Sequence, residues 1–275
     1  MNCILYLTDF SEPSDKALAY IMPVADELRA RIIFVHHING DAAKQKVNKK
    51  EEKEFLPYFN LLKSKVIKYA FANNCEMRTG HLLIKGDIVE NMLSLLKQLS
   101  PYAIATHYDY AARSKILLGN VYHQLLKVLT APVMIIPEYA EYVEIKAIGY
   151  FTGMVKTMHA EFNDLVYKMR MFKSKLFAFY LTPEIKQQPD RLIDELTDLF
   201  PDAVKNDRIS LKKLEPKYIA SRIDKLVEEM EINLAAFNAG DQIFDDIFNS
   251  GHSVRPFLLK TPVLIYPERF VEVEN

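Results

Sequence analysis

The sequence predicts an α/β protein with two doubly wound domains, each built on a five-stranded parallel sheet. Short apolar runs alternate with helical patterns along all 275 residues, as strands joined by crossover helices require. The segment 131–138 (APVMIIPE) recurs in the second half as 261–268 (TPVLIYPE). This internal repeat indicates two copies of one domain in tandem, which we place at residues 1–140 and 146–270.

The first copy alternates strands and helices from its N-terminus onward. Ser11 is expected to cap the first helix, with Pro13 in the first turn, where its missing N–H costs little. Residues 76–81 alternate weakly and are expected near the edge of the sheet. The predicted strands are 3–8, 31–37, 76–81, 102–105 and 133–136, and the predicted helices are 11–29, 54–69, 86–99 and 119–129.

The second copy repeats this order and begins near Lys146. Pro256 is awkward inside a helix, so the last helix is expected to begin near Ser253, with the proline in its first turn. The predicted strands are 147–151, 175–181, 203–209, 232–237 and 262–266, and the predicted helices are 158–171, 189–200, 216–230, a short 241–248 and one from 253. The linker at 139–145 is short, which indicates that the two copies pack together.

Composition excludes several classes of function. A net charge of −1 gives no electrostatic basis for binding nucleic acid or an anionic membrane. Cys3 and Cys75 are the only cysteines, so we expect neither a disulfide nor a zinc framework. No apolar run approaches the roughly 20 residues of a membrane helix, and the N-terminus opens into a strand rather than a signal peptide. These features predict a cytoplasmic location.

Three stretches resemble the universal stress protein family in its tandem two-domain form: 4–11 (ILYLTDFS), the run from 105–107 (ATH) to 117–121 (LLGNV), and the Pro-Val endings of both copies. The resemblance covers essentially the whole chain. It implies an adenine nucleotide alpha hydrolase-like fold with strand order 3-2-1-4-5 in each copy. It also implies that the last strands, from Val133 to Ile136 and from Val263 to Tyr266, pair antiparallel, so that each chain is its own pseudo-dimer. A homodimer of whole chains and an unknown protein partner stay open.

ATP-binding members of this family carry Gly-x2-Gly-x9-Gly-Ser/Thr in the loop after the fourth strand. Glycines let backbone N–H groups approach the phosphates, and the hydroxyl adds a contact at a helix start. In this sequence Ala105 and Tyr108 stand at the first two glycine positions, residues 109–118 separate Tyr108 from Gly119, and Asn120 replaces the Ser/Thr. The phosphate half of the motif is therefore degenerate.

The positions that would hold the nucleoside match the family pattern better than the positions that would hold the phosphates. Asp9 matches the family aspartate that helps to hold the nucleoside, and His36 stands where the second strand would offer backbone groups to adenine. The candidate adenine-nucleotide site thus comprises Asp9, His36, Ala105, Thr106, Gly119, Asn120 and Val121. In the second copy we place Thr152 at the position of Asp9. The loop 238–241 there keeps one displaced glycine, so no nucleotide is expected in that copy.

Three further groups have a functional and a structural interpretation. His36, His37 and His107 at strand ends suggest a metal or acid–base site, but no carboxylate stands at ligand spacing beside them, which favours ordinary strand-end residues. Aspartates at 241, 245 and 246 resemble a metal cluster, yet their pattern favours a solvated face. Four tyrosines are interpreted as a base-stacking surface or as a plug in a vacated phosphate pocket: Tyr102, Tyr108, Tyr110 and Tyr122.

We therefore expect a non-catalytic stress-response or regulatory protein that binds a small ligand or a protein partner, with no metal and no certain cofactor. Two alternatives stay open. One is an ATP-binding member with slow ATP hydrolysis in the first copy. The other is a pure interaction scaffold, in which side chains fill both pockets.

Overall fold

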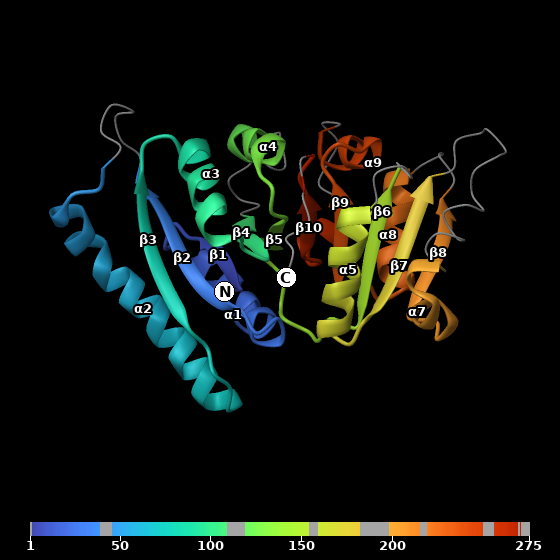
Figure 1. The fold of residues 1–275 in the computed structure, drawn as a ribbon, viewed down its shortest axis with the longest axis horizontal. Helices are drawn as coiled ribbons and strands as arrows, with labels where there is room; N and C mark the ends of the chain where they lie inside the picture. The colour runs from blue at the N-terminus through green and yellow to red at the C-terminus, as the bar shows by residue number, and fades with distance from the viewer. Residues whose placement is uncertain are drawn as a thin grey trace.

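Ten strands form one continuous sheet in the order β3-β2-β1-β4-β5-β10-β9-β6-β7-β8 (Figure 1). The computed structural model describes residues 2–38, 46–108, 119–153, 159–181, 198–214, 219–249, 256–268 and 270. Within each half the strands are parallel and follow the predicted order 3-2-1-4-5, with β6 to β10 repeating the arrangement of β1 to β5. The predicted fold class is confirmed.

The elements of the first half follow the sequence pattern closely. They are β1 (Cys3–Leu7), α1 (Glu12–Glu27), β2 (Arg31–Ile38), α2 (Lys49–Asn73), β3 (Thr79–Lys85), α3 (Ile88–Leu99), β4 (Ala103–Tyr108), α4 (Gly119–Val128) and β5 (Val133–Pro137). Ser11 caps α1 by accepting a hydrogen bond from the Ser14 N–H, as expected. Asn48 and Glu51 form a capping box that begins α2.

The second half has shorter described helices. Its elements are β6 (Ala147–Thr152), α5 (His159–Met171), β7 (Lys175–Leu181), α7 (Pro201–Lys205), β8 (Ile209–Leu214), α8 (Ile219–Glu229), β9 (Leu234–Asn238), α9 (Gln242–Phe244), the π-helical turn η2 (Asp245–Asn249), the 3₁₀ helix η3 (Pro256–Leu259) and β10 (Val263–Tyr266). Most of the helix predicted at 189–200, and the predicted helix start at Ser253, lie outside the described residues.

Two predicted strands are wrong in position. The third strand of the second half is not 203–209, because Pro201 begins the helix α7 and Val204 packs from it onto the core. The strand follows as β8. In the first half β3 begins at Thr79 rather than at 76, since α2 runs on to Asn73 and ends at Asn74 in the left-handed conformation (φ 51°). In the first half a helix extends further than its apolar pattern indicated, and in the second half a separate short helix occupies the start of the predicted strand.

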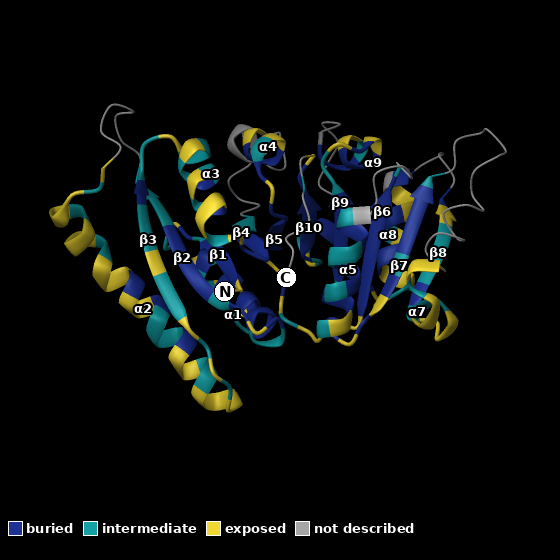
Figure 2. Ribbon diagram, in the orientation of Figure 1, coloured by how far each residue is buried: buried dark blue, intermediate teal, exposed yellow. Residues whose placement is uncertain are grey.

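Helices cover both faces of the sheet. Buried residues of α1, α2 and α5 form one apolar cluster with one face of the strands, and those of α3, α4 and α8 form a second cluster with the other face. Figure 2 shows the central strands as mostly buried and the outer side of α2 as largely exposed. The predicted place of the third strand at the edge of the sheet is confirmed by the position of β3.

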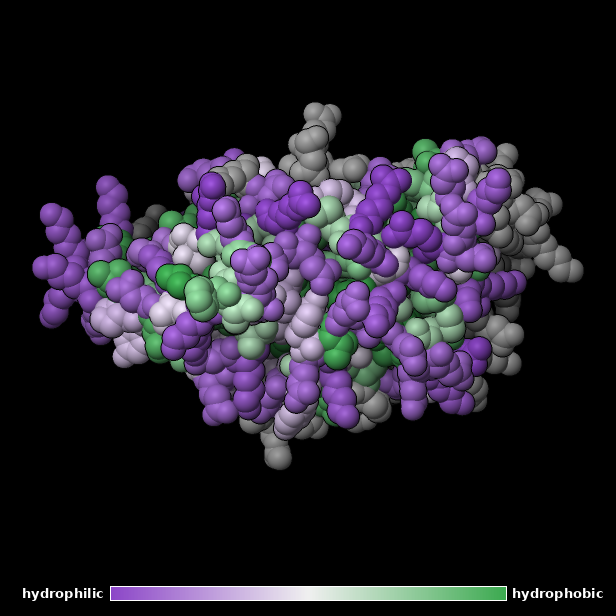
Figure 3. Space-filling view, turned by 90° about the horizontal axis from the view of Figure 1, so that it is seen from below, coloured by the Kyte–Doolittle hydropathy of each residue, from purple (hydrophilic) through white to green (hydrophobic). Residues whose placement is uncertain are grey.

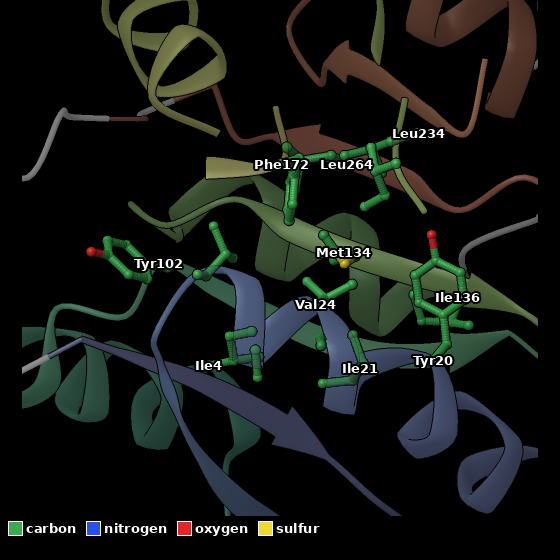
Figure 4. Packing of buried hydrophobic residues seen from close by; sticks show 14 of the residues in the cluster. Ile4, Tyr20, Ile21, Val24, Tyr102, Met134, Ile136, Phe172, Leu234 and Leu264 are labelled. Carbon is green, nitrogen blue, oxygen red and sulfur yellow. The ribbon is translucent and has the colours of Figure 1, made fainter. Parts of the chain in front are cut away.

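The two halves meet where β5 and β10 pair antiparallel. Met134 lies opposite Leu264, and both side chains are buried in the cluster that contains α1 and α5 (Figure 4). Tyr102 and Tyr167 join the halves at one side of this seam, with their hydroxyls 2.8 Å apart. The pairing leaves neither β5 nor β10 as an open edge.

The outer surface seen in Figure 3 is mostly hydrophilic, with smaller hydrophobic patches between charged side chains. Among the helices that the structure describes, none is both long enough and apolar enough to cross a membrane.

Candidate functional site

The candidate site of the first half lies at the carboxyl ends of β1 and β4. These neighbouring strands mark the point where the strand order reverses, because β1 also pairs with β2 on its other side. Ligands of open α/β sheets bind at such a switch point. Asp9 follows β1 and His107 lies in β4, and Oδ2 of Asp9 is 3.6 Å from Nε2 of His107. The fold therefore brings together two predicted residues 98 positions apart (107 − 9).

The Asp9 carboxylate is held in place and kept ionised. Its Oδ1 accepts hydrogen bonds from the backbone N–H of Ser11 at 3.0 Å and from the Ser11 hydroxyl at 2.6 Å. Partial burial alone would raise the pKa of Asp9, but the Ser11 hydrogen bonds and the nearby His107 outweigh it and lower the pKa. The side chain is 57% exposed, so Oδ2 is accessible to a ligand.

His107 presents one ring nitrogen to Asp9 and buries the other. Its side chain is only 14% exposed. The buried Nδ1 has no hydrogen-bond partner among the residues that the structure describes. Buried polar atoms are normally paired, so this nitrogen is a candidate contact for a ligand or for a group in the loop that follows β4.

His36 and His37 point to backbone carbonyls and not to a shared centre. His36 Nδ1 lies 2.7 Å from the Thr8 carbonyl, and His37 Nε2 lies 2.6 Å from the Gly86 carbonyl. Burial lowers the pKa of His36, although the Thr8 carbonyl opposes this shift. Over the described ranges, no group of three or more His, Cys, Asp or Glu side chains is arranged to hold a metal ion.

An aromatic cluster that the sequence did not reveal covers the side of the site next to β2. Phe10 adopts a left-handed backbone conformation (φ 62°), which is uncommon for a residue with a large side chain. The centroid of its ring lies 4.5 Å from that of the His36 ring and 5.2 Å from that of the Tyr58 ring. Tyr58 belongs to α2. Phe55 of α2 lies 4.8 Å from His36 on the same side. Aromatic rings therefore lie beside His36, where the sequence indicated only backbone groups.

The remaining predicted site residues are only partly informative. Ala105 and Thr106 are buried in β4, with the Ala105 methyl group inside the core. Gly119, Asn120 and Val121 form the first turn of α4. Beyond this backbone placement they lie outside the described part of the structure. Residues 109–118 also lie outside it, so the spacing of the degenerate loop stays a prediction from sequence.

The proposed tyrosine cluster does not form as one group. Tyr102 precedes β4 at the opposite end of the strand from the loop, and its hydroxyl contacts Tyr167 at the seam. Tyr108 packs against the apolar cluster of the α3 and α4 face. Tyr110 and the Tyr122 side chain lie outside the described residues. Tyr102 and Tyr108 are close in sequence, but they lie at opposite ends of β4 and are therefore separated in space.

The equivalent site of the second half is shifted by one residue from the sequence alignment. Tyr6 pairs with Ala105 in the first half, and Tyr150 pairs with Ala236 in the second. Ala105 and Ala236 in turn pair with Met134 and Leu264 of the repeated closing segment. The two tyrosines therefore occupy equivalent positions.

Because these tyrosines are equivalent, Thr152 corresponds to Thr8 and not to Asp9. The residue at the position of Asp9 is Gly153. The placement of Thr152 opposite Asp9 is thus wrong. The Tyr-x-Thr pattern shared by both strands was the signal that would have corrected it.

Asp241 fills the second crevice. Its Oδ2 accepts hydrogen bonds from the Thr152 hydroxyl at 2.8 Å and from the Gly153 N–H, and its Oδ1 accepts from the Ile243 N–H at 2.9 Å. A Cβ at Gly153 would lie 2.7 Å from Oδ1 of Asp241. Asp241 is only 2% exposed, so its expected place on a solvated face is wrong. The carboxylate bridges the ends of β6 and β9, which closes the position where a ligand would bind.

Solved structures resemble this chain over nearly its whole length. A universal stress protein from Archaeoglobus fulgidus matches with a TM-score of 0.68 and 17% identity, over 97% of this chain and 98% of that one. The chain has the fold of the tandem universal stress proteins. No protein-family model matches the sequence, and the search of curated proteins also finds no match.

Two further solved structures share this fold. The cytoplasmic domain of a prokaryotic cation chloride cotransporter matches with a TM-score of 0.56 and 10% identity, over 98% of this chain and 96% of that one. A functionally unknown protein from Pseudomonas aeruginosa matches with a TM-score of 0.51 and 11% identity, over 97% and 92%. Identities this low establish a shared fold, and function has to be argued from the site.

Proposed function

We propose that the protein is a non-catalytic regulatory member of the universal stress protein family that binds a ligand or partner through its first half. The tandem fold and the Asp9 and His107 pair at the switch point support this proposal. The second half then serves mainly as the structural partner that completes the sheet, since Asp241 bridges its crevice.

The contrast between the two crevices carries the proposal. In the first half the aspartate after the central strand is 57% exposed and has one oxygen directed toward His107. In the second half the corresponding residue is Gly153, and a buried carboxylate from the next loop occupies the space. Two copies of one fold therefore offer one open carboxylate and one closed bridge.

The electrostatics of Asp9 favour binding over catalysis. A general base works best when its pKa lies near the operating pH, whereas the pKa of Asp9 is lowered. One of its oxygens already accepts two hydrogen bonds from Ser11. Such a carboxylate is suited to accept hydrogen bonds from ligand hydroxyl groups and to keep a fixed orientation.

An adenine nucleotide is the second candidate, with slow hydrolysis in the first half. Asp9 is placed to accept a hydrogen bond from a ribose hydroxyl, and the aromatic rings of Phe10 and Tyr58 offer a stacking surface beside β2. Against it stand Ala105 and Tyr108 at two glycine positions of the phosphate loop. The nucleoside part of the site is thus better equipped than the phosphate part.

Equilibrium titration with a fluorescent ATP analogue separates these functions. We expect the full chain to show no saturable binding at micromolar concentration. Saturable binding that is lost in Asp9→Ala would overturn the first proposal and favour the ATP-binding alternative. Asn120→Ala tests the phosphate side. Asp87→Ala, which removes the helix cap of α3, serves as a matched control for loss of an aspartate outside the candidate site.

The scaffold alternative has a separate test. Adenosine, AMP and ATP are each titrated against isotopically labelled protein, and amide shifts near Asp9 and His107 are followed. Shifts confined to this pair with any of the three support a ligand site. Absence of shifts with all three, together with unchanged spectra at high concentration, directs the search to a protein partner of this surface.

A further inference from the structure

A pocket lies between α1 and the segment that links the two halves. Its volume is about 530 Å³, within the range of small-molecule sites. Lys16, Ala19 and Tyr20 contribute from α1, and the linker residues 138–142 form the opposite wall. None of its lining residues belongs to the nucleotide site described above.

Tyr20 supplies a buried polar atom without a partner. The residue is 2% exposed, and its hydroxyl has no hydrogen-bond partner among the described residues. In Figure 4 the ring extends from α1 toward the seam, with the hydroxyl oxygen at its far end. Burial raises the pKa of Tyr20, so the hydroxyl is neutral at physiological pH and can both donate and accept. An unpaired hydroxyl of this kind costs stability unless something binds to it.

Carboxylates outnumber cations around the pocket. Glu138 and Glu141 line it, and Lys16 is its only lysine or arginine among the described lining residues. Lys16 already forms an ion pair with Glu12, with Nζ and Oε1 3.1 Å apart. The local balance is therefore negative, which favours a cationic ligand over a phosphate or carboxylate.

Aromatic rings form part of the wall. Tyr20 and Tyr142 pack edge to face with centroids 5.3 Å apart. The Tyr142 hydroxyl donates to the carboxylate of Glu27, which fixes this ring against α1. Ammonium groups bind well where tyrosine rings and carboxylates meet, through cation–π attraction and charge-assisted hydrogen bonds.

We propose that this pocket binds a small aliphatic ammonium ion, with one N–H donated to the Tyr20 hydroxyl and its charge facing Glu138 and Glu141. The ligand would contact α1 of the first half and the linker to the second half at the same time. This site is independent of the function proposed for Asp9, because it shares no residue with that site.

The probe is putrescine, a short diammonium ion, and its diol analogue is the neutral control of equal length. Isothermal titration calorimetry on the full chain measures both in the same buffer. We expect saturable binding of putrescine with a dissociation constant below about 1 mM and no binding of the diol. Binding of the diol with equal affinity, or no saturable heat with putrescine, would overturn the proposal.

Three variants locate the site. Tyr20→Phe removes only the hydroxyl and is expected to weaken putrescine about tenfold. Glu138→Gln with Glu141→Gln is expected to weaken it by at least about tenfold. Tyr167→Phe removes a hydroxyl elsewhere on the seam and should leave the affinity unchanged. Thermal unfolding of each variant verifies that the fold is retained.

Unchanged affinity in Tyr20→Phe and in the double glutamine variant, with the fold intact, would contradict the assignment even if putrescine binds somewhere. Asp9→Ala separates the two sites. It should leave putrescine binding unchanged, so failure of the nucleotide hypothesis and failure of this inference give different results. Competition of putrescine by inorganic phosphate would show that Lys16 dominates the pocket, and would also overturn the proposal.

Discussion

The hydroxyl of Thr152 donates a hydrogen bond to Oδ2 of Asp241 at 2.8 Å, across the crevice between β6 and β9. The equivalent threonine of the first half, Thr8, instead contacts the Ser14 hydroxyl at 2.9 Å. The same residue at the same strand position thus turns toward its own helix in one half and toward the neighbouring loop in the other. This difference supports the proposal that the first half binds a ligand or partner and the second half is mainly structural.

Loss of the Asp241 bridge should destabilise the second half. Asp241→Ala removes a buried acceptor and leaves the Thr152 hydroxyl and the N–H groups of Gly153 and Ile243 without it. We expect the free energy of unfolding to fall by about 2–4 kcal/mol. Urea denaturation followed by circular dichroism measures the change. Glu229→Gln on the exposed side of α8 is the control and should change it by less than about 0.5 kcal/mol.

The effects of substitutions at Gly153 and Asp241 on the free energy of unfolding should depend on each other. A Cβ at Gly153 would approach Oδ1 of Asp241 to 2.7 Å, so Gly153→Ala is expected to cost about 1–3 kcal/mol. Removal of the carboxylate relieves this clash. In a double-mutant cycle, Gly153→Ala should cost much less in the Asp241→Ala background. Equal costs in both backgrounds would show that the two residues do not compete for the crevice.

A buried charge pair within α5 predicts that removal of its acid and removal of its base lower the free energy of unfolding by different amounts. Lys168 is fully buried and pairs with Asp164, which also accepts a hydrogen bond from the Tyr266 hydroxyl at 2.6 Å. Asp164→Ala leaves the Lys168 ammonium without this partner and should cost about 3–5 kcal/mol. Lys168→Met, which removes the cation but keeps its length, should cost less. Chemical denaturation of both variants tests the order, and a reversed order would contradict it.

Alkaline pH should unfold the protein through its buried tyrosines. Burial is the main cause that raises the pKa of Tyr20, Tyr102, Tyr142, Tyr150 and Tyr266, and it raises the pKa of Tyr69 to about 12. Unfolded tyrosines ionise near pH 10. Below that pH the stability from the neutral buried forms is fully present, and it is lost as the pH rises, because the unfolded chain releases protons first.

Ultraviolet absorbance of tyrosinate measures this behaviour. We expect a fraction of tyrosines to titrate near pH 10 and the buried group to ionise together with cooperative loss of secondary structure at higher pH. Smooth ionisation of all 15 tyrosines near pH 10 with the fold intact would show that these rings are accessible to water.

The sequence predicted the architecture well and the site only in part. Alternating apolar runs and the repeated Pro-Val endings predicted two α/β copies, because both are local patterns with a direct structural cause. The correct strand order followed from the resemblance to the universal stress protein family. The predicted register at Thr152 is off by one residue, whereas the Tyr-x-Thr pattern that both strands share gives the correct register.

Other features of the site depend on contacts between distant segments. Nothing near Asp241 indicates that its carboxylate reaches Gly153 of another strand. Phe10 meets Tyr58 only because α2 folds over the end of β2, and its left-handed backbone is not marked by a glycine. Such pairings are set by tertiary packing, which a single sequence does not display.

Single-turnover ATP hydrolysis by the full chain tests most directly the central claim that the first half is not catalytic. Release of labelled phosphate is measured for the wild type, Asp9→Ala and His107→Ala, each at protein concentrations above that of ATP. We predict that all three traces equal the buffer background. Phosphate release by the wild type that disappears in both variants would contradict the account and establish the Asp9 and His107 pair as catalytic.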